Sequence, residues 1–174
     1  MPSVEREIAR LRDSEQLFNL EEHSLRLVLF MGYSAFSLTR LNHIGPRDIQ
    51  TISLKEVPTE RNGAVSSKTA HLQPGNAVRF GRRHGLEIFD REGEIDEAQM
   101  RLIGALSISQ RLKNDSHLTR EHAEVLVIGP SEIVIKDFGS KNGTLVKDRV
   151  NRRAVRRGNL ALVHSRDWEL PSHP

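Results

Sequence analysis

The sequence contains no cysteine and few aromatic residues, which make up 5% of its 174 residues. Without cysteine the chain has neither disulfide bonds nor thiolate metal ligands, so its stability has to come from packing. Its longest largely apolar run spans residues 27–38, well short of the roughly twenty residues that a membrane-spanning helix needs. The first residues alternate positive and negative charges, which is not the composition of a secretory signal peptide. The sequence therefore predicts an intracellular, cytoplasmic protein without a transmembrane segment.

Motifs of the common enzyme classes are missing as well. The letters "DFG" at 137–139 match the metal-binding signature of protein kinases, but no Gly-rich loop, strand lysine or HRDxxxxN catalytic loop precedes them. The chain is also too short for the two lobes of a kinase. We find no Ser-His-Asp arrangement, phosphate-loop lysine or metal-ligand cluster. We therefore expect a protein that is not an enzyme and that uses no cofactor and no metal.

The positive charge of the chain is concentrated in two places. The formal net charge is only +3, but Arg79, Arg82 and Arg83 form one cluster, and residues 147–157 contain another. Such clusters can hold anions, either phosphate esters or nucleic acid. For the second cluster, a solvated surface is the simpler interpretation.

The first 45 residues have a helical pattern. Apolar residues recur at helical spacing near the N-terminus, and residues 19–22 have the composition of a capping box. We predict helices over 3–17 and 20–42. The second helix is apolar nearly all round, so we expect it to be buried against a domain or a partner. Residues 1–45 are therefore interpreted as a helical extension for docking or dimerisation.

From residue 46 onward the composition is that of a β protein, with short β-branched runs separated by turn formers. The runs interpreted as strands are DIQTISLKEV (48–57), NAVRFGR (76–82), IGALSIS (103–109), HAEVLVIG (122–129), EIVIKD (132–137), TLVK (144–147) and LALVH (160–164). The fourth and fifth runs meet at residues 129–131, which suggests a hairpin. Closely spaced strands without regular helices between them favour an antiparallel sandwich or barrel. We therefore predict a mainly β domain over 46–174.

Residues 84–105 do not follow the strand pattern, because they contain six acidic side chains within a short stretch. We interpret them as a long acidic insertion on the surface, with at most a turn or two of helix in its second half. The insertion follows the first basic cluster in the sequence. One hypothesis is therefore that it folds over a cationic site and competes with an anionic ligand.

Three short stretches carry polar groups suited to binding an anion. The first ends a predicted strand at Gly81-Arg82, the second places Thr119 and Arg120 just before a strand, and the third is the turn at 140–143. Loops at one end of a sandwich converge in space. Guanidinium, hydroxyl, ammonium and amide groups are what a phosphate ester next to a peptide backbone requires.

In order along the chain, these stretches read Gly81-Arg82, Thr119-Arg120-Glu121-His122 and Asp137-Phe138-Gly139-Ser140-Lys141-Asn142-Gly143-Thr144. This order resembles the sparse signature of the forkhead-associated (FHA) domain family: Gly-Arg, then Ser-Arg-x-His, then Asp-x-x-Ser-x-Asn-Gly-Thr. The likeness covers about residues 48–170. It implies an eleven-stranded antiparallel β-sandwich whose apical loops bind phosphothreonine-containing peptides without catalysis.

The resemblance also implies a role for each matching residue. Arg82 would bind the phosphate, and Thr119 would donate its hydroxyl to it. Arg120 would contact the phosphate or the peptide, and Lys141 would lie near the phosphate. Asn142 would form a hydrogen bond with the peptide main chain. The other motif residues are expected to be structural: Gly81, His122, Ser140 and Gly143.

The leading hypothesis is a phosphothreonine-peptide-binding module that mediates phosphorylation-dependent protein–protein interaction, as in signalling. Its partner would be a threonine-phosphorylated protein. One alternative is a phosphorylation-independent scaffold with the same fold, which would hold a fixed partner through the predicted helix 20–42. Another is a nucleic-acid binder that uses residues 147–157, although this stretch lacks interleaved aromatic residues for base stacking.

Overall fold

The computed structural model describes residues 25–40, 51–63, 65–129, 132–147, 152–155 and 160–162. In these residues the protein is mainly β, with eleven strands in two antiparallel sheets and two short helices. The prediction of a mainly β, antiparallel fold is confirmed. The predicted helix 3–17 lies outside the described residues.

One sheet, here called sheet A, has six strands in the order β10-β9-β1-β2-β3-β4. Its strands are β1 (Leu25–Met31), β2 (Ser34–Arg40), β3 (Ile52–Val57), β4 (Thr69–Leu72), β9 (Thr144–Lys147) and β10 (Arg152–Val155). The register places Leu29 of β1 between Phe36 of β2 and Val146 of β9. The N-terminal hairpin therefore lies in the middle of this sheet.

The other sheet, sheet B, has five strands in the order β11-β8-β7-β5-β6. Its strands are β5 (Ala77–Gly81), β6 (Gly85–Phe89), β7 (Ala123–Gly129), β8 (Glu132–Asp137) and β11 (Leu160–Leu162). In β7 the side chains of Ala123, Val125 and Val127 are buried, and the residues between them are partly exposed. Because side chains alternate along a strand, sheet B has one face toward the core and one toward solvent.

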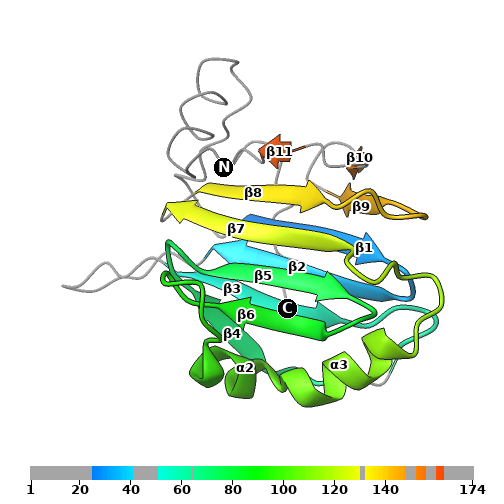
Figure 1. The fold of residues 1–174 in the computed structure, drawn as a ribbon, viewed down its shortest axis with the longest axis horizontal. Coiled ribbons are helices and arrows are strands. Elements are labelled where there is room, and N and C mark those ends of the chain that lie inside the picture. Colours follow the sequence, from blue (N-terminus) through cyan, green and yellow to red (C-terminus); the bar gives the residue numbers. More distant parts are fainter. Residues whose placement is uncertain are drawn as a thin grey trace.

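The two sheets pack face to face around an apolar core. Phe36 of sheet A and Phe80 of sheet B are both buried, and their ring centroids are 4.7 Å apart. Aliphatic side chains from both sheets and from the helices surround these rings. Figure 1 shows the strands crossing the molecule in the same general direction, with the helices along one side.

The prediction of a helix over 20–42 is wrong for residues 25–40, which form the β1–β2 hairpin. A continuous apolar run fits a fully buried strand as well as a buried helix, so periodicity alone could not separate them. The local signal for the hairpin is Gly32 in its two-residue turn, with φ +56°; a Cβ there would lie 2.3 Å from the Asp115 carboxylate. Because the hairpin is inside sheet A, its buried side chains are not available for the predicted docking or dimerisation.

The segment 84–105, predicted as an acidic surface insertion, contains regular structure. It begins with β6 and continues into α2 (Glu97–Ile103) and α3 (Ala105–Lys113). α2 packs against β4 and β6, and α3 packs against β6 and β5. The helices therefore cover the side of the sandwich where the edge strands β4 and β6 lie (Figure 1). In the described part of the chain, no helix is long and apolar enough to cross a membrane.

Six of the seven runs interpreted as strands contain strands, namely β3, β5, β7, β8, β9 and β11. The hairpin predicted around 129–131 is confirmed by the antiparallel pairing of β7 with β8. The run 103–109 is wrong as a strand, because Ala105, Ile108 and Leu112 are buried at helical spacing within and just after it. The strands β4, β6 and β10 are absent from the predictions.

Because β1 and β2 lie between β9 and β3, we expect a fragment of residues 46–174 not to fold. Without the hairpin, sheet A would be divided into two-stranded pieces, which are marginally stable at best. The fragment and the full-length chain can be compared by amide dispersion in NMR spectra and by thermal unfolding. A dispersed spectrum and a cooperative transition for the fragment would show instead that residues 46–174 are an independent domain.

The burial of α3 predicts that Ile108→Ala lowers the free energy of unfolding by about 2–5 kcal/mol, because it leaves a cavity in the core. Ile108 is 1% exposed, whereas Leu106 on the same helix is 79% exposed. Leu106→Ala is therefore the matched control, with an expected change within about 0.5 kcal/mol. Urea denaturation measures both values. Similar small effects for the two variants would mean that α3 does not belong to the core.

Candidate functional site

Three connections lie at the same end of the sandwich, on the right in Figure 1. They are the β5–β6 turn (82–84), the segment before β7 (114–122) and the β8–β9 connection (138–143). The structure thus brings together the five residues predicted to bind ligand: Arg82, Thr119, Arg120, Lys141 and Asn142.

Backbone hydrogen bonds join the first two connections. The N–H of Arg82 donates to the carbonyl of Thr119 at 3.0 Å, and the N–H of Arg83 donates to the carbonyl of Arg120 at 3.1 Å. Gly81 lies next to this contact, where a Cβ would be 2.1 Å from the carbonyl oxygen of Arg120. A side chain at position 81 would push the two connections apart, which explains why glycine precedes Arg82.

His122 joins the second connection to the third. Its side chain is fully buried; the N–H of Thr119 donates to Nδ1 at 3.2 Å, and Nε2 lies 2.9 Å from the carbonyl oxygen of Gly143. Because a carbonyl can only accept, the ring carries its proton on Nε2 and accepts at Nδ1, which is a neutral tautomer. Burial lowers the pKa of His122 below 6.5, although the Gly143 carbonyl and two nearby carboxylates act in the opposite direction.

Asp137 shapes the third connection with its buried carboxylate. Oδ1 accepts from the N–H groups of Gly139 and Ser140 at 2.8 and 2.7 Å. Oδ2 accepts from the hydroxyls of Ser140 and Thr144 at 2.6 and 2.8 Å. Burial by itself raises the pKa of Asp137, but these hydrogen bonds favour the charged form and bring the pKa below 3.8. A single ionised side chain therefore holds the backbone of this connection in place.

Two further contacts attach the third connection to the second. The backbone N–H of Lys141 donates to Oγ1 of Thr119 at 2.9 Å, and Nδ2 of Asn142 donates to the carbonyl of His117 at 2.9 Å. Thr119 uses a lone pair in this contact, so its O–H can still donate to a ligand. Asn142 uses one amide hydrogen, which leaves the second hydrogen and Oδ1 with capacity for a ligand.

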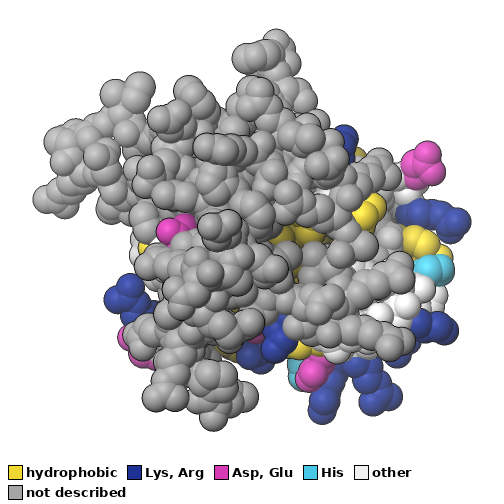
Figure 2. Space-filling view, turned by 90° about the horizontal axis from the view of Figure 1, so that it is seen from above, with side chains coloured by type: hydrophobic (Ala, Val, Ile, Leu, Met, Phe, Trp, Pro, Cys, Tyr) yellow, Lys and Arg dark blue, Asp and Glu magenta, His cyan; other side chains and the backbone are white. Residues whose placement is uncertain are grey.

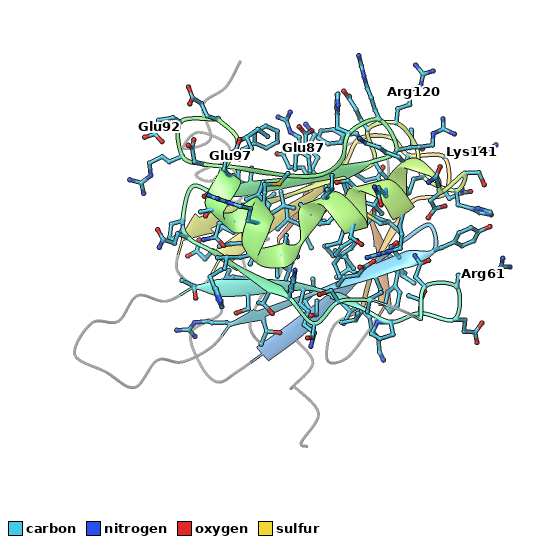
Figure 3. The ribbon with its side chains drawn as sticks, turned by 90° about the horizontal axis from the view of Figure 1, so that it is seen from below. Arg61, Glu87, Glu92, Glu97, Arg120 and Lys141 are labelled. Carbon is cyan, nitrogen blue, oxygen red and sulfur yellow. The ribbon has the colours of Figure 1, made fainter. Side chains whose placement is uncertain are left out.

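Exposed cations surround these contacts. They are Arg82, Arg83, Arg120 and Lys141. Within the described part of the chain, none of the four lies within ion-pair distance of a carboxylate. Figure 3 shows Arg120 and Lys141 pointing outward from the same end, and Figure 2 shows Lys and Arg side chains gathered there. Positive charge that is not neutralised internally favours the binding of an anion.

The part of the segment 84–105 that follows β6 does not cover this end of the molecule (Figure 3), although Glu87 within β6 lines a hollow together with Arg120. In Figure 3, Glu92 and Glu97 lie at the opposite end from Arg120 and Lys141. The hypothesis that this segment folds over the cationic site is therefore wrong, because β6 and the packing of α2 fix the segment elsewhere.

Sequence reasoning assigned no structural role to Asp137 and missed Asp115. Asp115 is buried, and its carboxylate accepts from the N–H groups of Tyr33 and His117 at 2.7 and 2.9 Å. It thereby ties the second connection to the β1–β2 turn. The available signal was an Asp followed closely by Ser or Gly between regular elements, which is typical of turns that a carboxylate organises.

Two other predictions concern metals and the basic stretch. Among the described residues, no three His, Asp or Glu side chains are grouped as a metal site would require. Most side chains of the basic stretch 147–157 lie outside the description. The nucleic-acid alternative therefore stays a hypothesis.

Comparison with protein-family models found a match over part of the chain. The FHA domain model matches residues 102–167, less than half of the chain. The match includes the second and third motif stretches, and Gly81-Arg82 precedes it. The predicted resemblance is thus confirmed over this segment, and FHA domains are in general interaction modules that bind phosphorylated partners. Searches of curated proteins and of solved structures found no match.

Because the folded state holds His122 neutral with a lowered pKa, we expect the free energy of unfolding to fall as the pH drops below 6.5. In that range the unfolded chain binds a proton at this histidine, whereas the folded chain keeps the ring neutral. The contribution of His122 to the free energy of unfolding is therefore fully present above pH 6.5 and is lost toward lower pH. The lowered pKa of Asp137 adds acid sensitivity only below about pH 3.8, which separates the two effects.

NMR titration of the imidazole of His122 measures this shift directly. Thermal unfolding at several pH values then tests the effect on stability. A pKa of His122 at or above 6.5 would contradict the neutral, buried tautomer.

Proposed function

We propose that this protein binds partners phosphorylated on threonine and thereby mediates phosphorylation-dependent protein–protein interactions. The observation that supports this most directly is the exposed group formed by Arg82, Arg120 and Lys141 on the connections that meet at Thr119. These cations have no carboxylate partner among the described residues, and hydrogen bonds hold their connections together. The proposed module binds its ligand without catalysis.

The chemistry of the group suits a phosphate monoester. A phosphorylated side chain carries about −1.5 to −2 charges at neutral pH and three strong acceptor oxygens. Arg82 offers a planar fork of N–H donors that matches two of these oxygens. The ammonium of Lys141 and the O–H of Thr119 would bind the remaining acceptor positions. Since Arg82 lacks an internal partner in the described structure, a phosphate has no carboxylate to displace.

The surroundings of the group suit a peptide. Asn142 has polar capacity left for a peptide main chain after its bond to the carbonyl of His117. Next to Asn142 is a hollow of about 300 Å³ whose walls include the apolar side chains of Phe30, Met31 and Leu145. It offers an apolar surface for the part of the ligand beside the phosphate.

We expect Arg82→Ala to weaken the binding of phosphothreonine peptides by roughly tenfold to over a hundredfold. The reason is that a hydrogen bond to a charged group contributes about 1.5–3 kcal/mol. Arg82→Lys keeps the charge but loses the fork, so its loss should be intermediate. Fluorescence polarisation against a degenerate phosphothreonine library, with phosphoserine and unphosphorylated peptides alongside, measures these affinities.

The matched control is Arg101→Ala, which removes an exposed arginine from α2, away from the three connections. Its effect should stay below about twofold, within the small range of exposed charges. If Arg82→Ala changes affinity by no more than the control does, Arg82 does not bind the phosphate. Equal binding of phosphorylated and unphosphorylated peptides would instead favour a phosphorylation-independent scaffold.

A further inference from the structure

A second hollow, of about 420 Å³, adjoins the candidate site on the solvent-facing side of sheet B. Its lining includes Gly81 and Arg120, which also belong to the joined connections of the candidate site. The hollow therefore begins at the connections where the proposed ligand would bind.

Two glycines that face each other in the sheet form part of the lining of the hollow. Gly81 of β5 pairs with Gly85 of β6, and neither residue adds a side chain to this row of the sheet. Gly85 has φ +74°, and a Cβ there would lie 2.3 Å from the Cβ of Ser109 on α3. The packing of α3 thus requires glycine at position 85, and the backbone of this row lines the hollow.

Aromatic and charged side chains form the rest of the lining. Phe89 and Phe138 contribute half-buried rings. The guanidinium of Arg79 lies 4.9 Å from the centroid of the Phe89 ring, and its Nε donates to Glu124 at 2.7 Å. The positive charge of Arg79 is therefore already engaged by the protein.

Two carboxylates in the lining, those of Glu87 and Glu121, are not paired with a cation of the described residues. Glu87 lies opposite Arg79 in the register of β5 and β6, but the ion pair of Arg79 is with Glu124. Within the described part of the chain, neither Glu87 nor Glu121 has a cation within ion-pair distance. The other titratable side chains of the hollow are His84 and Arg120. With Arg120 assigned to the phosphopeptide, Glu87 and Glu121 are the unpaired charges left in the lining itself. Lys136 lies outside the lining, with its ammonium 5.3 Å from the centroid of the Phe138 ring.

We propose that this hollow binds a lysine or arginine side chain of the same phosphopeptide, a step that rests on the proposed function. The basic head group would pair with Glu87 and Glu121, and its methylene stem would lie against the phenylalanine rings. The module would thus select ligands that are basic near the phosphothreonine.

The geometry limits the distance between the two ligand residues. Glu87 lies two residues after Gly85 along β6, which corresponds to about 7 Å. An extended peptide covers at most about 3.3–3.6 Å per residue. The basic residue should therefore be about two to four positions from the phosphothreonine.

The test uses full-length protein and phosphothreonine peptides in which one lysine is placed two, three or four positions before or after the phosphothreonine. Each peptide is compared with its glutamine counterpart by fluorescence polarisation at pH 7.5. We expect lysine on one side to bind about three- to tenfold tighter, the range for a partly exposed ion pair with a ring contact. Glu87→Gln should remove this preference, and Glu87→Lys should reverse it toward a glutamate-containing peptide.

Glu92→Gln is the control, because Glu92 lies at the other end of the molecule (Figure 3). It should leave the preference unchanged. Unchanged affinity of Glu87→Gln for the glutamine peptide shows that the variant is folded. Two results would overturn the inference about the hollow and leave the proposed function standing, provided that binding depends on Arg82. One is equal affinity for the lysine and glutamine peptides. The other is that the Glu87→Gln variant still binds the lysine peptide more tightly. If no phosphopeptide binds, both are overturned.

Discussion

The buried imidazole and backbone of His122 form the contact on which the arrangement of the ligand-facing connections depends. Its ring accepts from Thr119 and donates to Gly143, and its main chain donates to the carbonyl of Phe80 and accepts from the N–H of Phe138, at 2.9 and 3.0 Å. One residue thus uses all four of its polar groups to connect the ends of three strands. Unsatisfied buried polar groups are costly, so each of these bonds also restricts where its partner can lie.

This arrangement separates the groups that hold the site from the groups that face the ligand. The scaffold consists of buried, fully hydrogen-bonded side chains such as His122 and Asp137. The exposed cations around it have no internal carboxylate partners among the described residues. Like charges held close together repel one another, so a rigid scaffold is needed to keep them assembled before an anion arrives. Preorganisation of this kind reduces the ordering that binding would otherwise require.

The sequence predicted the parts of the fold whose signals are local. The β-branched runs of β7 and β8 and the turn formers between them are visible in the letters themselves. The motif stretches indicated which residues meet at one end of the sandwich, because each stretch lies at a strand end. The buried hairpin 25–40 could not be recognised in this way, since a segment buried on both faces has no periodicity to reveal its conformation. The contacts of Asp115 with Tyr33 and His117 were also invisible, because they join residues that are far apart in the sequence.

The position of the β1–β2 hairpin also affects how the chain can fold. Val28 of β1 pairs with Lys147 of β9, so the sheet is completed by segments from opposite ends of the described chain. Such non-local pairing requires closing a long loop before any contact is gained, which slows folding. During synthesis the hairpin is made early, but its neighbour β9 is made late. The apolar side chains of the hairpin therefore lack their final partners until β9 has been synthesised. During this time, aggregation and binding by chaperones compete with folding.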